Sequence, residues 1–367
     1  MPQGDRTRAV VTREVHHSHH HSHAHHHADV NQRSMPQPQA APQQRLSRFI
    51  YSNCTGKKKA VCIGINYNNT QAQLRGCVND AKNVRKYLIR HHNYKSHDVV
   101  MLTDDATDPR LLPTRQNILN AMHWLVHNAH PHDSLFFHCH GGQIPDTVSV
   151  RDHHMFSPPQ IPPTLAGSPT SGRVSGIAQP GGAVRPSPQL EVYRRPPGRL
   201  SLKDKDGDEV DGWDEVIFPV DYKKTGVITD DEMHKLMVKP LPTGCRLTAL
   251  FDSCHSGSVL DLPYLYHTNG RVKGSQVTPS HIQEKSTPAD VISWSGCNDS
   301  QTSADTTEQG VAVGAMSYAF MTCLREKPNS TYQELLRNIR AILRDKYKQK
   351  PQLSSSHHID ITLRFIM

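Results

Sequence analysis

Two short motifs combine cysteine, histidine and small residues in a way that suits nucleophilic catalysis. Residues 138–143 read HCHGGQ, and residues 252–257 read DSCHSG. A cysteine sulfur becomes a strong nucleophile when a turn exposes it, a positive field lowers its pKa and nearby backbone amides can hold an oxyanion. A histidine from a separate loop can then act as the general base. A single cysteine is more often part of a core, but the two motifs together predict a cysteine-based catalytic site.

Both motifs follow an apolar segment of the kind that forms a buried strand. The sequence predicts strands at 57–66, 98–104, 133–139, 246–252, 290–295 and 359–366. Apolar residues at helical spacing predict helices at 74–91, 114–129, 226–238, 310–325 and 332–347. Thr114 is the expected N-cap of the second helix, and Thr229 or Asp230 that of the third. This alternation predicts an α/β fold with a mostly parallel sheet covered by helices on both faces, where reactive residues gather beyond the carboxyl ends of the strands.

The chain of 367 residues is only 35% hydrophobic, but the shortfall is local. Nine of the 26 histidines fall in Val15–Ala28, and eleven of the 26 prolines fall between Ile144 and Arg199. Segments of this composition bury too little apolar surface to offset the entropy of ordering them. We therefore predict a disordered tail at residues 1–56 and a folded domain at residues 57–367, interrupted by a disordered insert at residues 144–199.

The composition also excludes several classes of protein. The eight cysteines form no CxxC pair, which fits free thiols in a reducing, intracellular compartment. No run approaches the roughly 18–20 apolar residues of a membrane span, and the first residues lack the apolar segment of a signal peptide. The net charge is +8, yet no basic stripe with interleaved aromatic residues occurs, so we expect neither a membrane nor a nucleic-acid partner.

Several long segments resemble the type I metacaspases of fungal type, which are caspase-like cysteine peptidases. The matching strings lie at residues 134–143 (SLFFH…HGGQ), 206–221 (DGDEVDGWDEVIFPVD), 228–264 (ITDDEM…LDLPY) and 350–367 (KPQLSSSHHIDITLRFIM). The resemblance implies a caspase-like fold, in which a mostly parallel sheet of six strands is flanked by helices. It also implies a calcium-dependent endopeptidase that cleaves after Arg or Lys, processes itself, and acts in stress response or programmed cell death.

The resemblance assigns roles to individual residues. The nucleophile of the family's DxCxSG pattern falls on Cys254, and the histidine before Gly-Gly, which is the family's base, falls on His140, with His138 as a fallback. The acidic pocket for the Arg or Lys side chain falls on Asp252 and Asp80, with Cys77 beside them. The alternative for Asp80 is a solvated position on a helix.

A calcium site is also implied by the resemblance, and carboxylates are the ligands that calcium prefers. It falls on Asp214, Asp230, Asp231 and Asp261. The alternative role for Asp230 and Asp231 is the capping of a helix. Self-processing would use basic residues between Asn269 and Ser286, where Arg271, Lys273 and Lys285 are present.

Around the candidate base the sequence departs from the family. The family reads HYSGHGG where this chain reads HCHGG, so two residues are missing, and the 56-residue insert follows at once. A displacement of about 1 Å at a catalytic group can lower the rate roughly a hundredfold. A retained intron with a shifted splice junction would explain both departures. The alternative function is therefore a catalytically impaired caspase-fold protein that handles stress or protein aggregates through its low-complexity tail. The third candidate function is metal buffering by the histidine tract.

For the partners and the location, the resemblance implies protein or peptide substrates with Arg or Lys before the cleaved bond. Protein aggregates or chaperones are the partners that the alternative function implies. We expect a monomer in the cytoplasm, with the nucleus as a second location.

Overall fold

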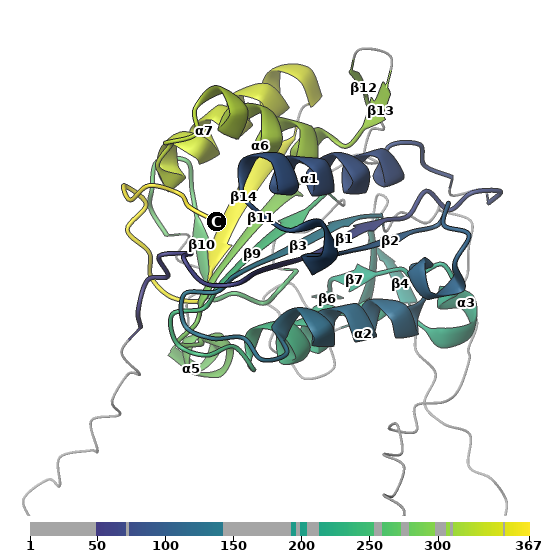
Figure 1. The fold of residues 1–367 in the computed structure, drawn as a ribbon, viewed down its shortest axis with the longest axis horizontal. Coiled ribbons are helices and arrows are strands. Elements are labelled where there is room, and N and C mark those ends of the chain that lie inside the picture. Colours follow the sequence, from purple (N-terminus) through teal and green to yellow (C-terminus); the bar gives the residue numbers. More distant parts are fainter. Residues whose placement is uncertain are drawn as a thin grey trace, which may run out of the picture. The chain divides into compact units, whose positions relative to one another are not determined.

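A central sheet of seven strands runs through the domain (Figure 1). The computed structural model describes residues 49–70, 73–141, 192–195, 199–203, 213–252, 259–272, 279–297, 306–308, 311–347 and 349–367. The strands of the sheet are β1 (Lys58–Gly64), β2 (Val99–Thr103), β3 (Ser134–His140), β9 (Arg246–Phe251), β10 (Tyr264–Tyr266), β11 (Asp290–Cys297) and β14 (Lys350–Ser355). Their spatial order is β10-β14-β11-β9-β3-β1-β2.

Five neighbouring strands of this sheet are parallel, and two at one edge are antiparallel. β2, β1, β3, β9 and β11 pair in parallel, whereas β14 runs antiparallel to β11, and β10 antiparallel to β14. Every residue of β3 and of β9 is buried, as expected for strands at the centre of a sheet with two covered faces. The predicted α/β class with a mostly parallel sheet is confirmed, and the short edge strand β10 adds a seventh strand to the six expected.

Helices cover both faces of the sheet, and a separate apolar cluster fills each interface (Figure 1). One face carries α1 (Cys77–His91), α6 (Ala315–Glu326) and α7 (Tyr332–Ile342), which continues as the π-helical turn Leu343–Tyr347. The other carries α2 (Arg115–Val126), α5 (Pro279–Lys285) and α4 (Asp230–Met233), which continues as the π-helical turn His234–Val238. The hydroxyls of Thr114 and Thr229 cap α2 and α4 as predicted. Within the described residues, none of these helices has the length and apolar character of a membrane span.

Shorter strands and turns lie outside the seven-stranded sheet. β4 (Val192–Arg195), β5 (Arg199–Lys203) and β6 (Trp213–Asp214) form a small antiparallel sheet, β7 (Val216–Ile217) pairs with β8 (Ile228–Thr229), and β12 (Thr306–Glu308) pairs with β13 (Val311–Val313). The remaining elements are the short helix α3 (Tyr222–Thr225) and the 3-10 turns Ser96–Asp98 and Pro109–Leu111. The end of the predicted insert therefore supplies β4 and the first residue of β5, while the rest of the insert and the tail before residue 49 lie outside the described residues.

Residues 49–56 pack against the domain, although the sequence placed them in the disordered tail. The N–H of Ser52 donates to the Asp290 carboxylate at 3.0 Å, and the N–H of Gly56 donates to the carbonyl of His132 at 2.9 Å. Cys54 is buried between them. Aromatic contacts, such as the stacking of Phe49 on His357, hold this segment together with the backbone hydrogen bonds, so the predicted boundary at residue 57 was wrong.

The last strand also lies earlier than predicted. It covers Lys350–Ser355, whereas residues 359–366 contribute only an isolated bridge between Arg364 and Thr331. The apolar residues that predicted a strand there, Ile359 and Phe365, are buried in the cluster under α7 without pairing along a neighbouring strand. Their spacing reflects packing against a helix, so the prediction of a strand was wrong.

Candidate active site

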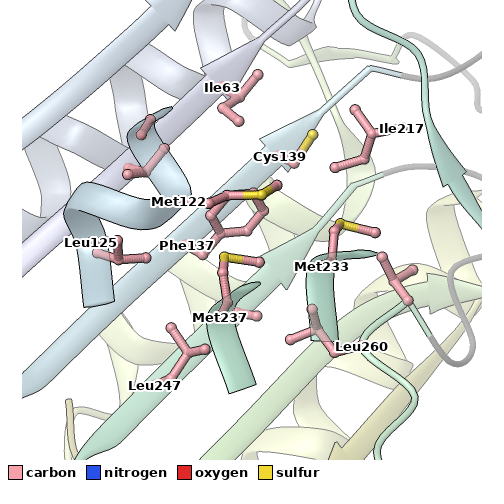
Figure 2. Packing of buried hydrophobic residues seen from close by; sticks show 14 of the residues in the cluster. Ile63, Met122, Leu125, Phe137, Cys139, Ile217, Met233, Met237, Leu247 and Leu260 are labelled. Atoms are coloured by element: carbon pink, nitrogen blue, oxygen red, sulfur yellow. The ribbon is translucent and has the colours of Figure 1, made fainter. Parts of the chain in front are cut away.

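His140 is the last residue of β3, and strand alternation turns it toward the face covered by α1 and α6. The same alternation places His138 on that face and Cys139 on the opposite one. Figure 2 shows Cys139 inside an apolar cluster with Met122 and Ile217. Burial raises the pKa of the Cys139 thiol to about 12, so this cysteine is a core residue and not a nucleophile.

The imidazole of His140 is held by Asp80, which lies in the first turn of α1. His140 Nδ1 lies 2.6 Å from Asp80 Oδ2, and the same oxygen accepts the N–H of Gly314 at 2.5 Å. The side chains of His140 and Asp80 are 3% and 0% exposed. The pair is therefore buried where β3, α1 and the start of α6 meet, and Asp80 is not the solvated helix residue that was the alternative for it.

Asp252, the residue directly after β9, joins this pair from the neighbouring strand. Its Oδ2 accepts the N–H of Ser317 at 2.7 Å and its Oδ1 that of Met316 at 3.3 Å, so it caps α6, whose own N-cap is a glycine. One polar atom from each of Asp80, His140 and Asp252 lies within 4.8 Å of the other two. We call these three residues the His140 cluster.

Two glycines allow the cluster to form. A Cβ on Gly314 would collide with the carboxylates of Asp80 and Asp252. A Cβ on Gly64 of β1 would collide with the backbone of Cys77 at the start of α1. Without these side chains, α1 and the start of α6 can approach the sheet closely enough to bring their polar groups onto His140. The sequence did not point to Gly314, because it lay inside the helix predicted at 310–325, whereas α6 begins only at Ala315 and Val311–Val313 form β13.

The cluster holds His140 in its protonated form. Burial alone would lower the pKa of His140, but Cys77, the Asp252 charge and the hydrogen bond to Asp80 together raise it well above its usual value. Burial raises the pKa of Asp80 to about 6, because the contact with His140 only partly offsets the loss of water. At neutral pH the pair is an imidazolium beside a carboxylate.

His138 is a poor substitute for this base. It is completely buried, and its Nε2 lies 3.0 Å from the hydroxyl of Ser317. Burial, together with the neighbouring charge of His140, lowers the pKa of His138 to about 3. A histidine that stays neutral and has no exposed nitrogen cannot exchange a proton with a substrate, so the fallback has no support.

A cavity of about 260 Å³ borders Asp80 between α1 and α6. Its lining also includes Lys86, Arg90 and Arg325. A cavity lined by three cations and one carboxylate does not suit an Arg or Lys side chain. A pocket of the predicted acidic kind would therefore have to open on the other side of the His140 cluster, toward the residues that follow β9.

The predicted nucleophile lies outside the described residues, as do all of residues 253–258. In the sequence, Cys254 follows Asp252 by two residues, and Asp252 comes directly after β9, the strand beside β3. Of the predicted catalytic and pocket residues, the structure brings together Asp80, Cys77, His140 and Asp252.

The predicted calcium ligands lie apart from this cluster, around the start of α4. Asp230 accepts the N–H of Glu215 at 2.7 Å and that of Asp231 at 2.9 Å, so it holds one N–H of the first turn of α4, while the N-cap of that helix is Thr229. Asp214 lies in β6, and its side chain is not among those described.

Asp231 and Asp261 both point at the ammonium group of Lys285. Lys285 Nζ lies 2.7 Å from Asp231 Oδ1 and 3.1 Å from Asp261 Oδ2. We call these three residues the Lys285 cluster. The sequence indicated Lys285 only as a basic residue available for self-processing, and no pattern around it predicts a buried lysine.

Comparison with known proteins shows which family the chain belongs to. The family described as "Metacaspase, peptidase C14 domain" matches residues 58–157 and 198–263. Metacaspase-1 of Cryptococcus neoformans is 45% identical over 361 aligned residues, which cover 87% of this chain and 66% of that protein. Metacaspase-1A of Aspergillus terreus is 42% identical over 361 residues, which cover 87% of this chain and 75% of that protein.

These matches confirm the resemblance that the motifs indicated. The chain spans 66% of the length of the Cryptococcus relative, so that protein is longer than this chain. A solved structure of a Geobacter sulfurreducens protein superposes on 83% of this chain and 95% of its own, with a TM-score of 0.47 and 19% identity. On the evidence of its sequence relatives, the chain belongs to the metacaspase family.

Proposed function

We propose that this chain is a cysteine endopeptidase that cleaves after Arg or Lys, with Cys254 as the nucleophile and His140 as the base. One observation carries the proposal: His140, Asp80 and Asp252 converge at the carboxyl ends of β3 and β9, and Cys254 follows Asp252 by two residues. Ligands and reactive groups of open α/β sheets gather at this edge. The family membership supports the same reaction class.

The electrostatics of the His140 cluster suit the thiolate form of a cysteine. An imidazolium with a raised pKa stabilises a nearby thiolate. The ring of His140 is hydrogen-bonded to Asp80 and Cys77, so it would have to leave these partners before Nε2 could reach the sulfur of Cys254. In the proposed reaction the Cys254 thiolate attacks the carbonyl carbon, and His140 gives its Nε2 proton to the leaving amine. The products of this first half of the reaction are a thioester and a free amine. Water then attacks the thioester while Nε2 takes its proton, and Cys254 leaves as the thiolate.

Specificity for Arg or Lys would rest on Asp80 and Asp252. Both carboxylates are buried and bonded within the protein, to His140 and to the first turn of α6. A substrate guanidinium or ammonium would therefore have to replace at least one of these partners. Substrate binding and a rearrangement of the His140 cluster are coupled in this proposal.

Calcium would bind at the predicted carboxylates near the start of α4. The donor set fits this ion, because Asp231 and Asp261 already converge on a cation, the ammonium of Lys285. Asp230 and Asp214 would complete the set. Bound calcium would neutralise these carboxylates and fix the segment before β10, which also follows the candidate nucleophile.

Cleavage of fluorogenic peptides ending in Arg, Lys or Asp tests this function directly, with millimolar calcium or with a chelator. We expect cleavage of the Arg and Lys peptides only, with calcium, and its loss in Cys254→Ala and His140→Ala. Cys323→Ala is the matched control, since Cys323 is a buried cysteine of α6 outside the cluster. Equal activity of the wild-type chain and Cys254→Ala would defeat the proposal.

The contact between His140 and Asp80 also favours a second candidate function, that of a catalytically impaired caspase-fold protein. His140 is 2% exposed and bonded to the carboxylate that should receive the substrate, so base and pocket block one another. Inserting Ser-Gly after Cys139 restores the spacing of the family. If the wild-type chain cleaves no peptide and the insertion variant does, the impaired function holds; activity in the wild-type chain excludes it.

A further inference from the structure

The Lys285 cluster places a buried positive charge among the predicted calcium ligands. Lys285 is the last residue of α5, Asp231 lies in the first turn of α4, and Asp261 precedes β10. The side chains of Lys285 and Asp261 are 4% and 2% exposed. An ammonium group loses a large hydration energy when it is buried, and only close carboxylates compensate for that loss. These carboxylates therefore bind the lysine as an internal cation.

A second titratable group, His234, lies beside the Lys285 cluster. His234 of the π-helical turn donates from Nδ1 to the carbonyl of Leu260 at 2.7 Å, directly beside Asp261. Burial lowers the pKa of His234 to about 4, and the charge of Lys285 contributes to that shift. His234 is therefore neutral at physiological pH. It positions the backbone next to Asp261, while Lys285 supplies the charge.

An ammonium group and a calcium ion cannot both occupy this position. Calcium binds carboxylate oxygens at about 2.3–2.6 Å, and the Lys285 nitrogen lies 2.7 Å and 3.1 Å from the two oxygens that would bind it. The repulsion between the two cations adds to the steric conflict. Calcium can bind these two oxygens only after the lysine leaves.

We propose that Lys285 is a tethered counter-ion that competes with calcium, so that calcium binding expels its side chain and exposes the end of α5. The inference rests on the proposed calcium site and adds the residue that sets its affinity. Without calcium, the lysine neutralises the carboxylates and keeps α4, α5 and the segment before β10 together. With calcium, the ion takes over this role, and Lys285 becomes accessible to solvent.

Labelling of lysines tests the exchange in the full-length chain carrying Cys254→Ala, which prevents self-cleavage. The protein is acetylated briefly in chelator, in millimolar calcium and in millimolar magnesium, and each lysine is quantified by mass spectrometry. We expect labelling of Lys285 to rise several-fold in calcium alone. Lys235, which is exposed on the neighbouring π-helical turn, is the internal control and should not change. Protection of Lys285 in saturating calcium would overturn the inference.

Calcium affinity provides a second readout, measured by titration calorimetry in the same Cys254→Ala background. Lys285→Met removes the competing charge, so its Kd should fall about tenfold, which corresponds to about 1.4 kcal/mol. Lys285→Arg keeps the charge and should not bind calcium more tightly. Because Lys285→Met removes the cation that Asp231 and Asp261 contact, its melting temperature should drop in chelator and recover in calcium.

The outcomes separate the inference from the proposal beneath it. If Asp231→Asn abolishes calcium binding but Lys285→Met leaves the Kd unchanged, the calcium site stands and the competition by Lys285 is refuted. If neither the wild-type chain nor Lys285→Met binds calcium, the calcium site itself is refuted. The labelling experiment does not depend on any change at Lys285, so it decides the question even if Lys285→Met fails to fold.

Discussion

Replacing Asp80 by Asn tests the central claim about the His140 cluster, that a buried ion pair holds the candidate base. Asp80 and His140 lie 2.6 Å apart with almost no exposure to solvent. Removing one partner of a buried pair typically destabilises a protein by about 3–5 kcal/mol, because the other charge stays buried without compensation. We expect Asp80→Asn to lower the free energy of unfolding by an amount in this range at pH 7.

The pH dependence of this loss follows from the direction of the pKa shifts. The pKa of folded His140 lies above the value of about 6.5 in an unfolded chain, so its contribution to stability is present below that pH and disappears as the pH rises through the folded value. The raised pKa of Asp80, about 6, acts in the same sense: the folded state retains this proton longer than the unfolded state does. The pair is fully charged only between the two values. The effect of Asp80→Asn should therefore be largest there and shrink toward alkaline pH.

Urea unfolding of the Cys254→Ala chain, followed by tryptophan fluorescence at several pH values, measures this effect. Asp105→Asn is the matched control, since Asp105 pairs with Lys82 on the surface and such pairs contribute at most about 1 kcal/mol. A double variant with His140→Gln should lose less than the sum of the two single variants. The structure indicates that Asp80 and His140 are both ionised. This would be refuted if Asp80→Asn lowered the free energy of unfolding by no more than Asp105→Asn does, and by the same amount at every pH.

Three further predictions concern other buried groups. Gly314→Ala should destabilise the fold and abolish any peptidase activity together, because the added methyl group would collide with both carboxylates of the His140 cluster; unfolding and peptide assays measure this. Iodoacetamide should not label Cys139 in the native protein but should label it in urea, as peptide mapping would reveal, because burial keeps this thiol protonated. Asp290→Asn should lower the free energy of unfolding by about 3–5 kcal/mol, because it leaves Arg246 buried without its partner at 2.6 Å. The guanidinium of Arg246 holds the pKa of Asp290 low against the effect of burial, so this contribution should be present above about pH 4 and vanish in acid.

The strand ends were predictable from the sequence because each motif interrupts a continuous apolar run. Such a run has few alternatives to a central parallel strand, and parallel neighbours bring their ends to one edge of the sheet. This logic correctly brought His140 and Asp252 together. Asp80 came from the family resemblance, and its burial under Gly314 is what the fold adds.

The Lys285 cluster shows what sequence patterns miss. A lysine at the end of a short polar helix is typical of a solvated surface, and nothing in its neighbourhood distinguishes Lys285 from the exposed Lys235. Its burial depends on carboxylates 24 and 54 residues away along the chain. Long-range charge pairing leaves no periodic signal, so only the folded structure can reveal it.

The two residues missing after Cys139 determine what His140 can do. In this chain His140 still belongs to the ladder of β3: it pairs with Gly64, and its carbonyl accepts the N–H of Ile65 at 3.0 Å. A ladder residue has its side chain fixed perpendicular to the sheet, here under α1 and onto Asp80. Two added residues would move the histidine about 6.6 Å further along the chain, beyond the point where β3 pairs, at about 3.3 Å per residue. Under the proposed function, the shortening thus replaces a loop histidine that could meet a thiol with a strand histidine that neutralises the predicted acidic pocket. Activity of this chain would then require that His140 leave Asp80, and the cation of an Arg or Lys substrate is the group that could displace it.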